Sequence, residues 1–387
     1  MAKMNWNTDL LEKMIDEGYV NVNKHPTADL YIYNYTPKAQ FDWVWNEVTM
    51  KCRGLILDAS GEIVARPFEK FFSADQLETV PHINIPNEPF EAYEKMDGSL
   101  GVMYWTYDTN NDLLPLIATR GSFISDQACV ANDMLYDRYN HERKLDNGCP
   151  VYTLAEELAY YCNPSWTYLY EVIYPSNRIV VDYGYDHKLV LLAIIDTGTG
   201  EEISLKNAPP CVEVVKRYDG VKDWQSITDQ FDGDGREGFV IRFESGFRLK
   251  IKYEEYKRLH RIICNTSERT VWEHLKEGDS LTSLIKNVPD EFYNWLVNTI
   301  EKLQFRFRII EDFCKLQMDE IKVRLEERGD TSRKAWALEI QKVGEQYGKQ
   351  HCGIMFAMLT GWQLNRVRLS IWKLLRPSAH KPFQEEI

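Results

Sequence analysis

Residues 94–101 read EKMDGSLG, and the apolar, strand-like sequence VMYWTY follows at residues 102–107. This stretch has two interpretations that lead to different folds. In the first, Asp97 and Gly98 form a hairpin turn, because glycine tolerates positive φ and Asp-Gly is common in turns. In the second, Lys95 is a nucleophile at the mouth of a nucleotide pocket. From average residue usage, a Lys-x-Asp-Gly string arises by chance in roughly one chain in ten of this length, so the surrounding sequence must decide.

The composition is that of a globular protein with ordinary packed cores. The chain has 387 residues, of which 44% are hydrophobic, enough for about two domains. It contains no run of about 18 apolar residues, no signal-peptide core and no C-x-x-C pair. We therefore expect a cytoplasmic protein, in the host cytoplasm if it is viral, with reduced thiols, no membrane association and no evident obligate protein partner. The net charge of −13 means that any polyanion site must be a local concentration of Lys and Arg.

The pattern of apolar residues changes along the chain. Strand-like segments dominate up to about residue 260: ADLYIYNY (28–35), RGLILD (53–58), GVMYWTY (101–107), TYLYEVIY (167–174), KLVLLAIID (188–196), EGFVIRF (237–243) and FRLKIKY (247–253). Residues 125–145 have helical spacing instead and are predicted to pack on the sheet. After Asn265 the apolar residues recur at intervals of three and four as far as Gly329, which predicts one or two long helices, and further helical patterns follow. The sequence thus predicts a sheet-rich domain at 1–260 and an all-helical domain at 261–387.

Several charged residues stand at the ends of the strand-like segments. Lys250 and Lys252 alternate, so both would point to one face of a strand. Glu171 and Glu237 lie within or beside apolar strands, where a carboxylate is costly unless it is paired or binds a cation. Further cations stand at element ends: Arg53, Arg66, Lys70 and Arg120. Each alone is typical of a surface charge; together they provide a lysine nucleophile, two carboxylates for a metal and a ring of cations.

The segments EKMDGS, LYEVIYPSNRIV, EGFVIRF and LKIK resemble motifs I, III, IV and V of the covalent nucleotidyltransferases, the superfamily of ligases and capping enzymes. CRGLILD, RPFEKFF, NRIV and YIYNY are similar to segments of the bacteriophage RNA ligase 1 family, in the right order over about residues 30–260. The resemblance implies an α+β fold: a ligase-type nucleotidyltransferase domain built on antiparallel sheets, followed by an all-α carboxy-terminal domain. The tail resembles that family's carboxy-terminal domain only in length and helicity.

The resemblance also implies an ATP-dependent RNA ligase that acts in three steps. Lys95 would take AMP from ATP, pass it to an RNA 5′-phosphate, and release it when a 3′-hydroxyl attacks. Attack near neutral pH requires an uncharged amine, and neighbouring cations favour that form. We therefore expect Lys250, Lys252 and a bound Mg²⁺ or Mn²⁺ to activate Lys95 and to stabilise the transferred phosphoryl group.

The resemblance assigns the remaining site residues by position. Asp97 and Gly98 would shape the nucleotide loop, and Glu171 and Glu237 would hold the metal, its waters or the ribose. The other residues expected to bind ATP are Tyr33, Arg53, Lys70, Arg120, Val240 and Tyr256. At position 120 some relatives have lysine; arginine keeps the charge and adds a bidentate fork. The implied partners are RNA ends, with a broken tRNA anticodon loop as the suggested substrate and the helical domain recognising the tRNA body.

Three alternatives stay open at this point. DNA ligases and mRNA capping guanylyltransferases share the Lys-x-Asp-Gly chemistry, but they usually append a β-barrel, whereas the apolar period after Lys252 is helical. A non-catalytic RNA-binding protein that senses a nucleotide would not need the lysines and carboxylates together. In the tail, the basic sequence NRVRLSIWKLLR (365–376) could contact phosphate or be a solvated helix face.

Overall fold

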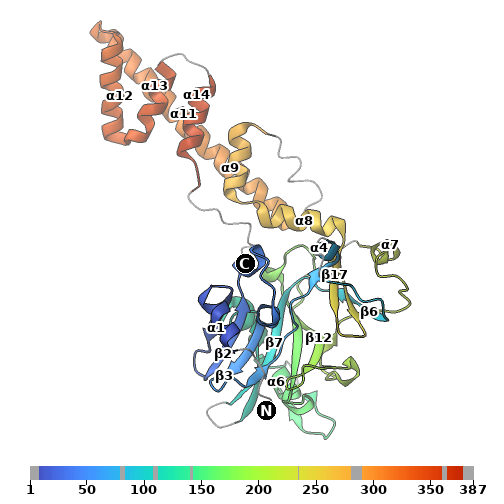
Figure 1. Ribbon diagram of the computed structural model, residues 1–387. Helices are drawn as coiled ribbons and strands as arrows, with labels where there is room; N and C mark the ends of the chain where they lie inside the picture. Colours follow the sequence, from blue (N-terminus) through green and yellow to red (C-terminus); the bar gives the residue numbers. More distant parts are fainter. Residues whose placement is uncertain are drawn as a thin grey trace. The chain divides into compact units, whose positions relative to one another are not determined.

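The computed structural model describes residues 8–78, 83–107, 112–139, 143–233, 235–279, 290–359 and 364–377 (Figure 1). The chain divides into two compact units, Met1–Lys257 and Arg258–Ile387. The sequence analysis had placed a domain boundary at residue 260. Within the described residues, no helix combines the length and the apolarity that crossing a membrane requires.

A six-stranded sheet forms the centre of the first unit, in the order β13-β12-β11-β7-β8, with β14 beside β12. Its strands are β7 (Ser99–Tyr107), β8 (Leu113–Thr119), β11 (Trp166–Ile173), β12 (Lys188–Asp196), β13 (Glu202–Ile203) and β14 (Glu213–Val214). The central strands are apolar on both faces because each face is covered. Along β7, Met103 and Trp105 enter one core while Val102 and Tyr104 enter the other, as the two-residue period of a strand requires.

Helices cover one face of this sheet and a second sheet covers the other. The helices are α5 (Asp126–Tyr136) and α6 (Leu154–Tyr161), whose Leu135 and Leu158 are fully buried against it. The covering sheet has the order β1-β2-β3-β4 and consists of β1 (Val20–Lys24), β2 (Leu30–Tyr35), β3 (Arg53–Asp58) and β4 (Ile63–Ala65). Ile32 and Ile56 carry the contact to the central sheet. Figure 1 shows β2 and β3 beside β7.

A third sheet contains β6, the strand that ends at Lys95 of the Lys-x-Asp-Gly segment. Its order is β15-β6-β16-β17-β5, with β5 (Phe72–Ser73), β6 (Phe90–Lys95), β15 (Arg217–Tyr218), β16 (Gly238–Phe243) and β17 (Arg248–Lys252). Because β6 and β7 belong to different sheets, residues 96–98 carry the chain from one sheet to another. The hairpin interpretation is therefore wrong.

The predicted secondary structure is largely confirmed. All seven strand-like segments contain a strand, namely β2, β3, β7, β11, β12, β16 and β17. Of the described residues in 125–145, only those of α5 are helical; Arg143–Lys144 forms β9 and pairs with β10 (Pro150–Val151). The first unit also contains α1 (Thr8–Asp16), α2 (Pro37–Phe41), α3 (Glu47–Lys51), α4 (Ala74–Glu78), α7 (Ile227–Gln230) and 3₁₀ turns at Pro175–Asn177 and Leu205–Asn207.

Described residues of the second unit that lie in regular secondary structure are helical, which confirms the predicted α+β class. α8 (Glu254–Asn265) begins in the first unit and continues into the second. The others are α9 (Glu268–Glu277), α11 (Asp290–Arg328), α12 (Arg333–Tyr347), α13 (Cys352–Leu359), α14 (Leu364–Leu374) and a 3₁₀ turn at Lys349–His351. The periodic apolar residues belong to the single helix α11, which ends before Gly329 with φ +65°. Gly361 lies outside the described residues.

Candidate functional site

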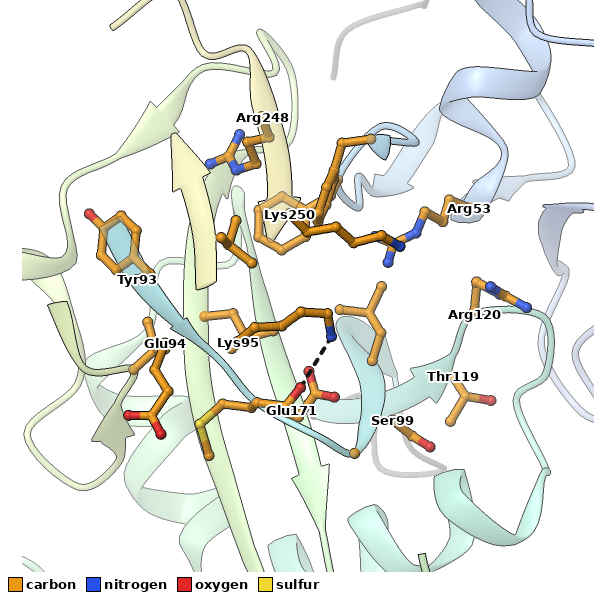
Figure 2. Close-up of a pocket in the computed structure, with 18 of the residues that line it drawn as sticks. Arg53, Tyr93, Glu94, Lys95, Ser99, Thr119, Arg120, Glu171, Arg248 and Lys250 are labelled. Atoms are coloured by element: carbon orange, nitrogen blue, oxygen red, sulfur yellow. Dashed lines mark hydrogen bonds between the residues drawn. The ribbon is translucent and has the colours of Figure 1, made fainter. Parts of the chain in front are cut away.

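A cavity of about 500 Å³ opens where the three larger sheets of the first unit meet. Lys95 is the last residue of β6. It lies between the two ends of the cavity, as Figure 2 shows. Six of the residues predicted from the sequence line it besides Lys95: Arg53, Gly98, Arg120, Glu171, Val240 and Lys250. Segments separated by almost two hundred residues along the chain therefore converge on one cavity of a size suited to a small ligand.

The two ends of the cavity differ in chemistry. One end is apolar, since the lining side chains Tyr93, Met96, Leu192 and Val215 belong to one hydrophobic cluster. The opposite end, on the other side of Lys95 in Figure 2, carries Arg53 and Arg120. An apolar pocket suits a base and a group of cations suits phosphates. A nucleotide with its base at the Tyr93 end would therefore place its first phosphate near Lys95.

Glu237 lies between two of the predicted catalytic lysines. Its Oε2 is 2.7 Å from Nζ of Lys95 and its Oε1 is 2.7 Å from Nζ of Lys252, and its side chain is only 3% exposed. The sequence predicts that Lys252, with Lys250 and a metal, helps to activate Lys95. In this structure the buried carboxylate of Glu237 separates the ammonium groups of Lys95 and Lys252 and compensates their charge.

Lys250 is the lysine that other cations surround. Burial lowers the pKa of its ammonium to about 7, and Lys70, Lys95, Arg53 and Lys252 add to the shift. Val240 and Lys250 are partners in the β16–β17 ladder, and both line the cavity. Lys250 therefore provides a group that changes charge near neutral pH at the cavity wall.

Glu171, on β11, is the carboxylate that lines the cavity next to Lys95. Burial raises its pKa to about 7; the charge of Lys95 opposes this effect, while Glu237 and Asp97 add to it. A carboxylate held at this pKa is neutral in about half of the molecules at pH 7. A divalent cation at this position would favour the ionised form, so the site fits a metal.

Asp97 is a structural anchor for the loop that follows Lys95. Its Oδ2 accepts hydrogen bonds from the backbone amides of Val180 and Val181 at 2.9 and 2.8 Å, and its Oδ1 accepts one from Tyr256 Oη at 2.7 Å. At Gly98 a Cβ atom would lie 2.6 Å from the carbonyl oxygen of Val172, so only glycine fits this close approach. Asp97 and Gly98 thus shape the loop, and the Asp97 carboxylate is held outside the cavity.

The cationic end is organised around Tyr35. Arg120 donates a hydrogen bond to Tyr35 Oη at 3.3 Å and lies over its ring. Arg53 lies over the ring of Phe71, and its buried Nη1 has no hydrogen-bond partner. Burial, and secondarily the nearby Arg120, lower the pKa of Arg53. Such an unsatisfied donor is costly unless an anion completes it.

Six predicted residues do not line the cavity: Asp97, Glu237, Lys252 and Tyr256, which make the contacts described above, and Tyr33 and Lys70, which lie elsewhere. Tyr33 does not line the cavity; it packs against the apolar clusters around Cys52 and Leu55, which is the packing role common for an aromatic side chain in a strand. Lys70 lines a neighbouring cavity, over the rings of Tyr35 and Trp45. Burial, with Arg53 and Arg120 as secondary causes, lowers its pKa to about 8, so its charge still acts on the cationic end.

One ion pair at the wall of the cavity was not predicted from the sequence. Arg248 and Glu202 both line it and form an ion pair, and Glu202 also accepts a hydrogen bond from Arg242 at 2.9 Å. Arg248 immediately precedes the LKIK segment, but Glu202 lies in a two-residue strand that carries no pattern. Other missed lining residues are Asn34, Phe68, Phe71, Glu94, Ser99, Thr119 and Gln127.

Comparison with known proteins places this site in a family. A family model for RNA ligases matches residues 51–256. The RNA ligase of Rhodothermus phage RM378 is 25% identical in an alignment of 311 positions that covers 65% of this chain and 68% of the phage protein.

Two solved structures are more distant. An archaeal ATP-dependent RNA ligase is 13% identical, with a TM-score of 0.40 over 88% of this chain and 87% of its own. A mutant of Naegleria gruberi RNA ligase with ATP and manganese is 16% identical, with a TM-score of 0.33 over 45% of this chain. The match spans about half of the Naegleria chain, 52%. The residues matched by the family model include all the cavity-lining residues between Arg53 and Lys250.

Proposed function

Because the chain belongs to the RNA ligase family, we propose that it joins RNA 5′-phosphate and 3′-hydroxyl ends in an ATP-dependent reaction that begins at Lys95. The observation that supports this most directly is the position of Lys95 between an apolar and a cationic end of one cavity. A nucleotide-sensing protein without catalysis would gain nothing from that arrangement. The family match also disfavours a DNA ligase or a capping guanylyltransferase.

In the first step, Nζ of Lys95 attacks the α-phosphorus of ATP. A nitrogen–phosphorus bond forms, the bond from the α-phosphorus to the bridging oxygen breaks, and pyrophosphate leaves. The ammonium must first lose a proton, and Oε2 of Glu237, at 2.7 Å, is positioned to accept it. Arg53, Arg120 and Lys250 would hold the β- and γ-phosphates, with the charge of Lys70 behind them.

In the second step, an oxygen of the RNA 5′-phosphate attacks the same phosphorus, and the bond to Lys95 breaks. In the third step, the 3′-hydroxyl of the other RNA end attacks the activated 5′-phosphate, a phosphodiester forms and AMP leaves. Arg53 and Arg120 remain at the phosphate end throughout, so the incoming RNA phosphate meets the cations that pyrophosphate has vacated.

We propose Glu171 as the carboxylate that would hold Mg²⁺ or Mn²⁺ at the cavity wall; Glu237, also predicted to hold the metal, has both of its oxygens in contact with the ammonium groups of Lys95 and Lys252. Among the described residues no cluster of three or more His, Cys, Asp or Glu side chains forms a closed metal cage. A cation at Glu171 would therefore need phosphate oxygens and waters as its other ligands, which is how Mg²⁺ is commonly held. When bound, the metal would act as a Lewis acid on the phosphate oxygens.

We further propose that the physiological substrate is a broken RNA such as a nicked tRNA anticodon loop, recognised through the helical unit. This substrate follows from the resemblance to the bacteriophage RNA ligase 1 family, and the phage relative is named an RNA ligase. Residues 258–387 carry a small excess of Lys and Arg over Asp and Glu, although the whole chain has a net charge of −13. The helical unit is therefore better suited than the rest of the chain to a polyanion.

Ligation of a 5′-labelled RNA tests the proposed function. With ATP and Mg²⁺, the wild-type protein should convert the label from a phosphatase-sensitive end to a phosphatase-resistant internal phosphodiester. Omitting ATP should abolish the conversion, and a labelled DNA strand of the same sequence serves as the comparison. If the label stays phosphatase-sensitive at every protein concentration, the proposal fails.

A further inference from the structure

A second cavity, of about 1040 Å³, adjoins the nucleotide cavity and has twice its volume. Phe68, Phe71, Glu202 and Arg248 line both cavities and so form their common wall. In the proposed roles ATP occupies the smaller cavity, and the larger one contributes to ATP binding only the charge of Lys70. The larger cavity therefore has room for a ligand larger than the one that the nucleotide cavity holds.

The side chains of the larger cavity combine cations with aromatic rings. Lys70 is 9% exposed, and its Nζ lies 5.0 Å from the ring centroid of Phe72. In the described residues it forms no ion pair, and only burial and other cations affect its pKa. A buried ammonium without a carboxylate partner is costly, and an anion entering the cavity would offset that cost.

Other residues extend this chemistry away from the nucleotide. Lys51, in the last turn of α3, and Phe247, after the turn between β16 and β17, line the larger cavity but not the smaller one. Arg248 lies over the ring of Phe68 at 4.7 Å. Cations that follow a backbone and aromatic faces for stacking bases are the features of a single-strand binding groove.

The acidic residues of this cavity do not contradict an anionic occupant. Glu202 is already paired with Arg242 and Arg248. The remaining carboxylates are exposed: Glu69, Glu201 and Glu244. Exposed charges are screened by salt, whereas the buried Lys70 is screened much less. The interior of the cavity therefore favours an anion more than its rim opposes one.

We propose that the larger cavity binds single-stranded RNA next to the end that reacts. This inference rests on the proposed ligase function and deepens it, because it gives the RNA a path out of the nucleotide cavity past Phe68 and Phe71. The occupying strand is either the 5′-phosphate strand or the 3′-hydroxyl strand. The chemistry recognised, phosphodiesters and bases, is the same for both.

The test uses the full-length protein with Lys51→Glu and Phe247→Ala, and with Lys144→Glu as the matched control. Lys144 is exposed on β9 and lines neither cavity, so this control changes the net charge equally. Adenylylation by ATP alone is measured first, and should agree with wild type within about twofold for all three variants.

Joining of a pre-adenylylated RNA strand to a 3′-hydroxyl strand is measured next, with each strand varied in length from two to ten nucleotides. Lys51→Glu should raise KM about tenfold for one of the two strands, and loss of one phosphate contact should reduce the salt slope by about 1. Phe247→Ala should raise KM for the same strand, while Lys144→Glu should not. The strand affected identifies the occupant.

Three results would overturn the inference. Unchanged KM for both strands would show that the larger cavity is not an RNA site. Equal loss of adenylylation would assign the cavity to ATP or pyrophosphate, and an equal effect of Lys144→Glu would mean only general charge repulsion. Failure of the ligase proposal is distinguishable, because wild type itself would then neither accept AMP nor join the pre-adenylylated strand.

Discussion

At the scale of single residues, the buried ammonium of Lys250 should lower the stability of the folded protein. Its folded pKa of about 7 lies below the ordinary 10.5, so between these values the unfolded chain binds a proton that the folded chain lacks. Stability should therefore rise with pH from about 7 to about 10.5. Lys250→Met removes the buried amine and should raise the melting temperature, more at pH 7 than at pH 10. Thermal unfolding at both pH values measures this; an equal gain at both would contradict it.

Although replacing Lys250 should stabilise the fold, it should slow the reaction. Removing one preorganised cation from a phosphoryl-transfer site costs on the order of 10²–10³ in rate. Lys250→Ala should slow single-turnover adenylylation by about that factor at saturating ATP and Mg²⁺. Lys188→Ala, on β12 and in ion pairs with Asp186 and Glu213, is a suitable control. An unchanged rate would place Lys250 outside the reaction.

The apparent affinity for the metal should depend on pH because of Glu171. Its pKa is raised to about 7, so below pH 7 the neutral acid dominates and a metal must displace a proton to bind. The apparent metal affinity in adenylylation should then fall up to about tenfold for each pH unit below 7 and level off above pH 8. Titrating Mn²⁺ at fixed ATP from pH 5.5 to 8.5 measures this. Glu171→Gln should flatten the pH dependence; a slope that persists in this variant would exclude Glu171 as its source.

At the scale of elements, a hydrogen bond joins the loop after β6 to the first turn of α8. Tyr256 donates it to the buried carboxylate of Asp97. Tyr256→Phe leaves that carboxylate oxygen unsatisfied and should lower the free energy of unfolding by about 1–3 kcal/mol, measured by denaturant titration. Tyr185→Phe, whose ring is 95% exposed, should have no effect. Equal effects of the two variants would show that the hydrogen bond does not stabilise the fold.

The elements also show what the sequence could and could not predict. Long apolar strands such as β7 and β12 carry a local signal, and α11 keeps its period over its whole length. β6, with the sequence FEAYEK, has only one fully buried side chain, Ala92, and was missed. Its membership in the third sheet depends on pairing with β16, some 150 residues later, and no local pattern encodes such a contact.

The site was predictable to a similar extent. Motif positions placed Lys95, Glu171 and Lys250 in one cavity. They could not show that Glu237 would lie between two lysines, that Lys70 would face the larger cavity, or that Tyr33 would pack in a core. Each of these outcomes is decided by tertiary neighbours from other strands.

At the scale of the whole molecule, the two units are expected to separate in function. Truncation after Asn265 keeps the whole of α8, including Tyr256, and removes most of the helical unit. The truncated protein should retain adenylylation, since the cavity residues all lie before it, and should lose preference for structured RNA over a short oligonucleotide. Adenylylation and competition ligation assays on a soluble, folded truncation measure both. Lost adenylylation in such a protein would show that the helical unit completes the active site.

The covalent bond between Lys95 and AMP is the central claim. The most direct measurement is incubation with ATP labelled in its α-phosphate and Mg²⁺, followed by denaturing electrophoresis and mass spectrometry of the labelled peptide. The account predicts a label that survives denaturation, is absent with γ-labelled ATP, and maps to Lys95. Lys95→Ala and Lys95→Arg should both be unlabelled, the latter because a guanidinium stays protonated. A folded Lys95→Ala protein that still takes up the α-label to the wild-type extent would contradict the account.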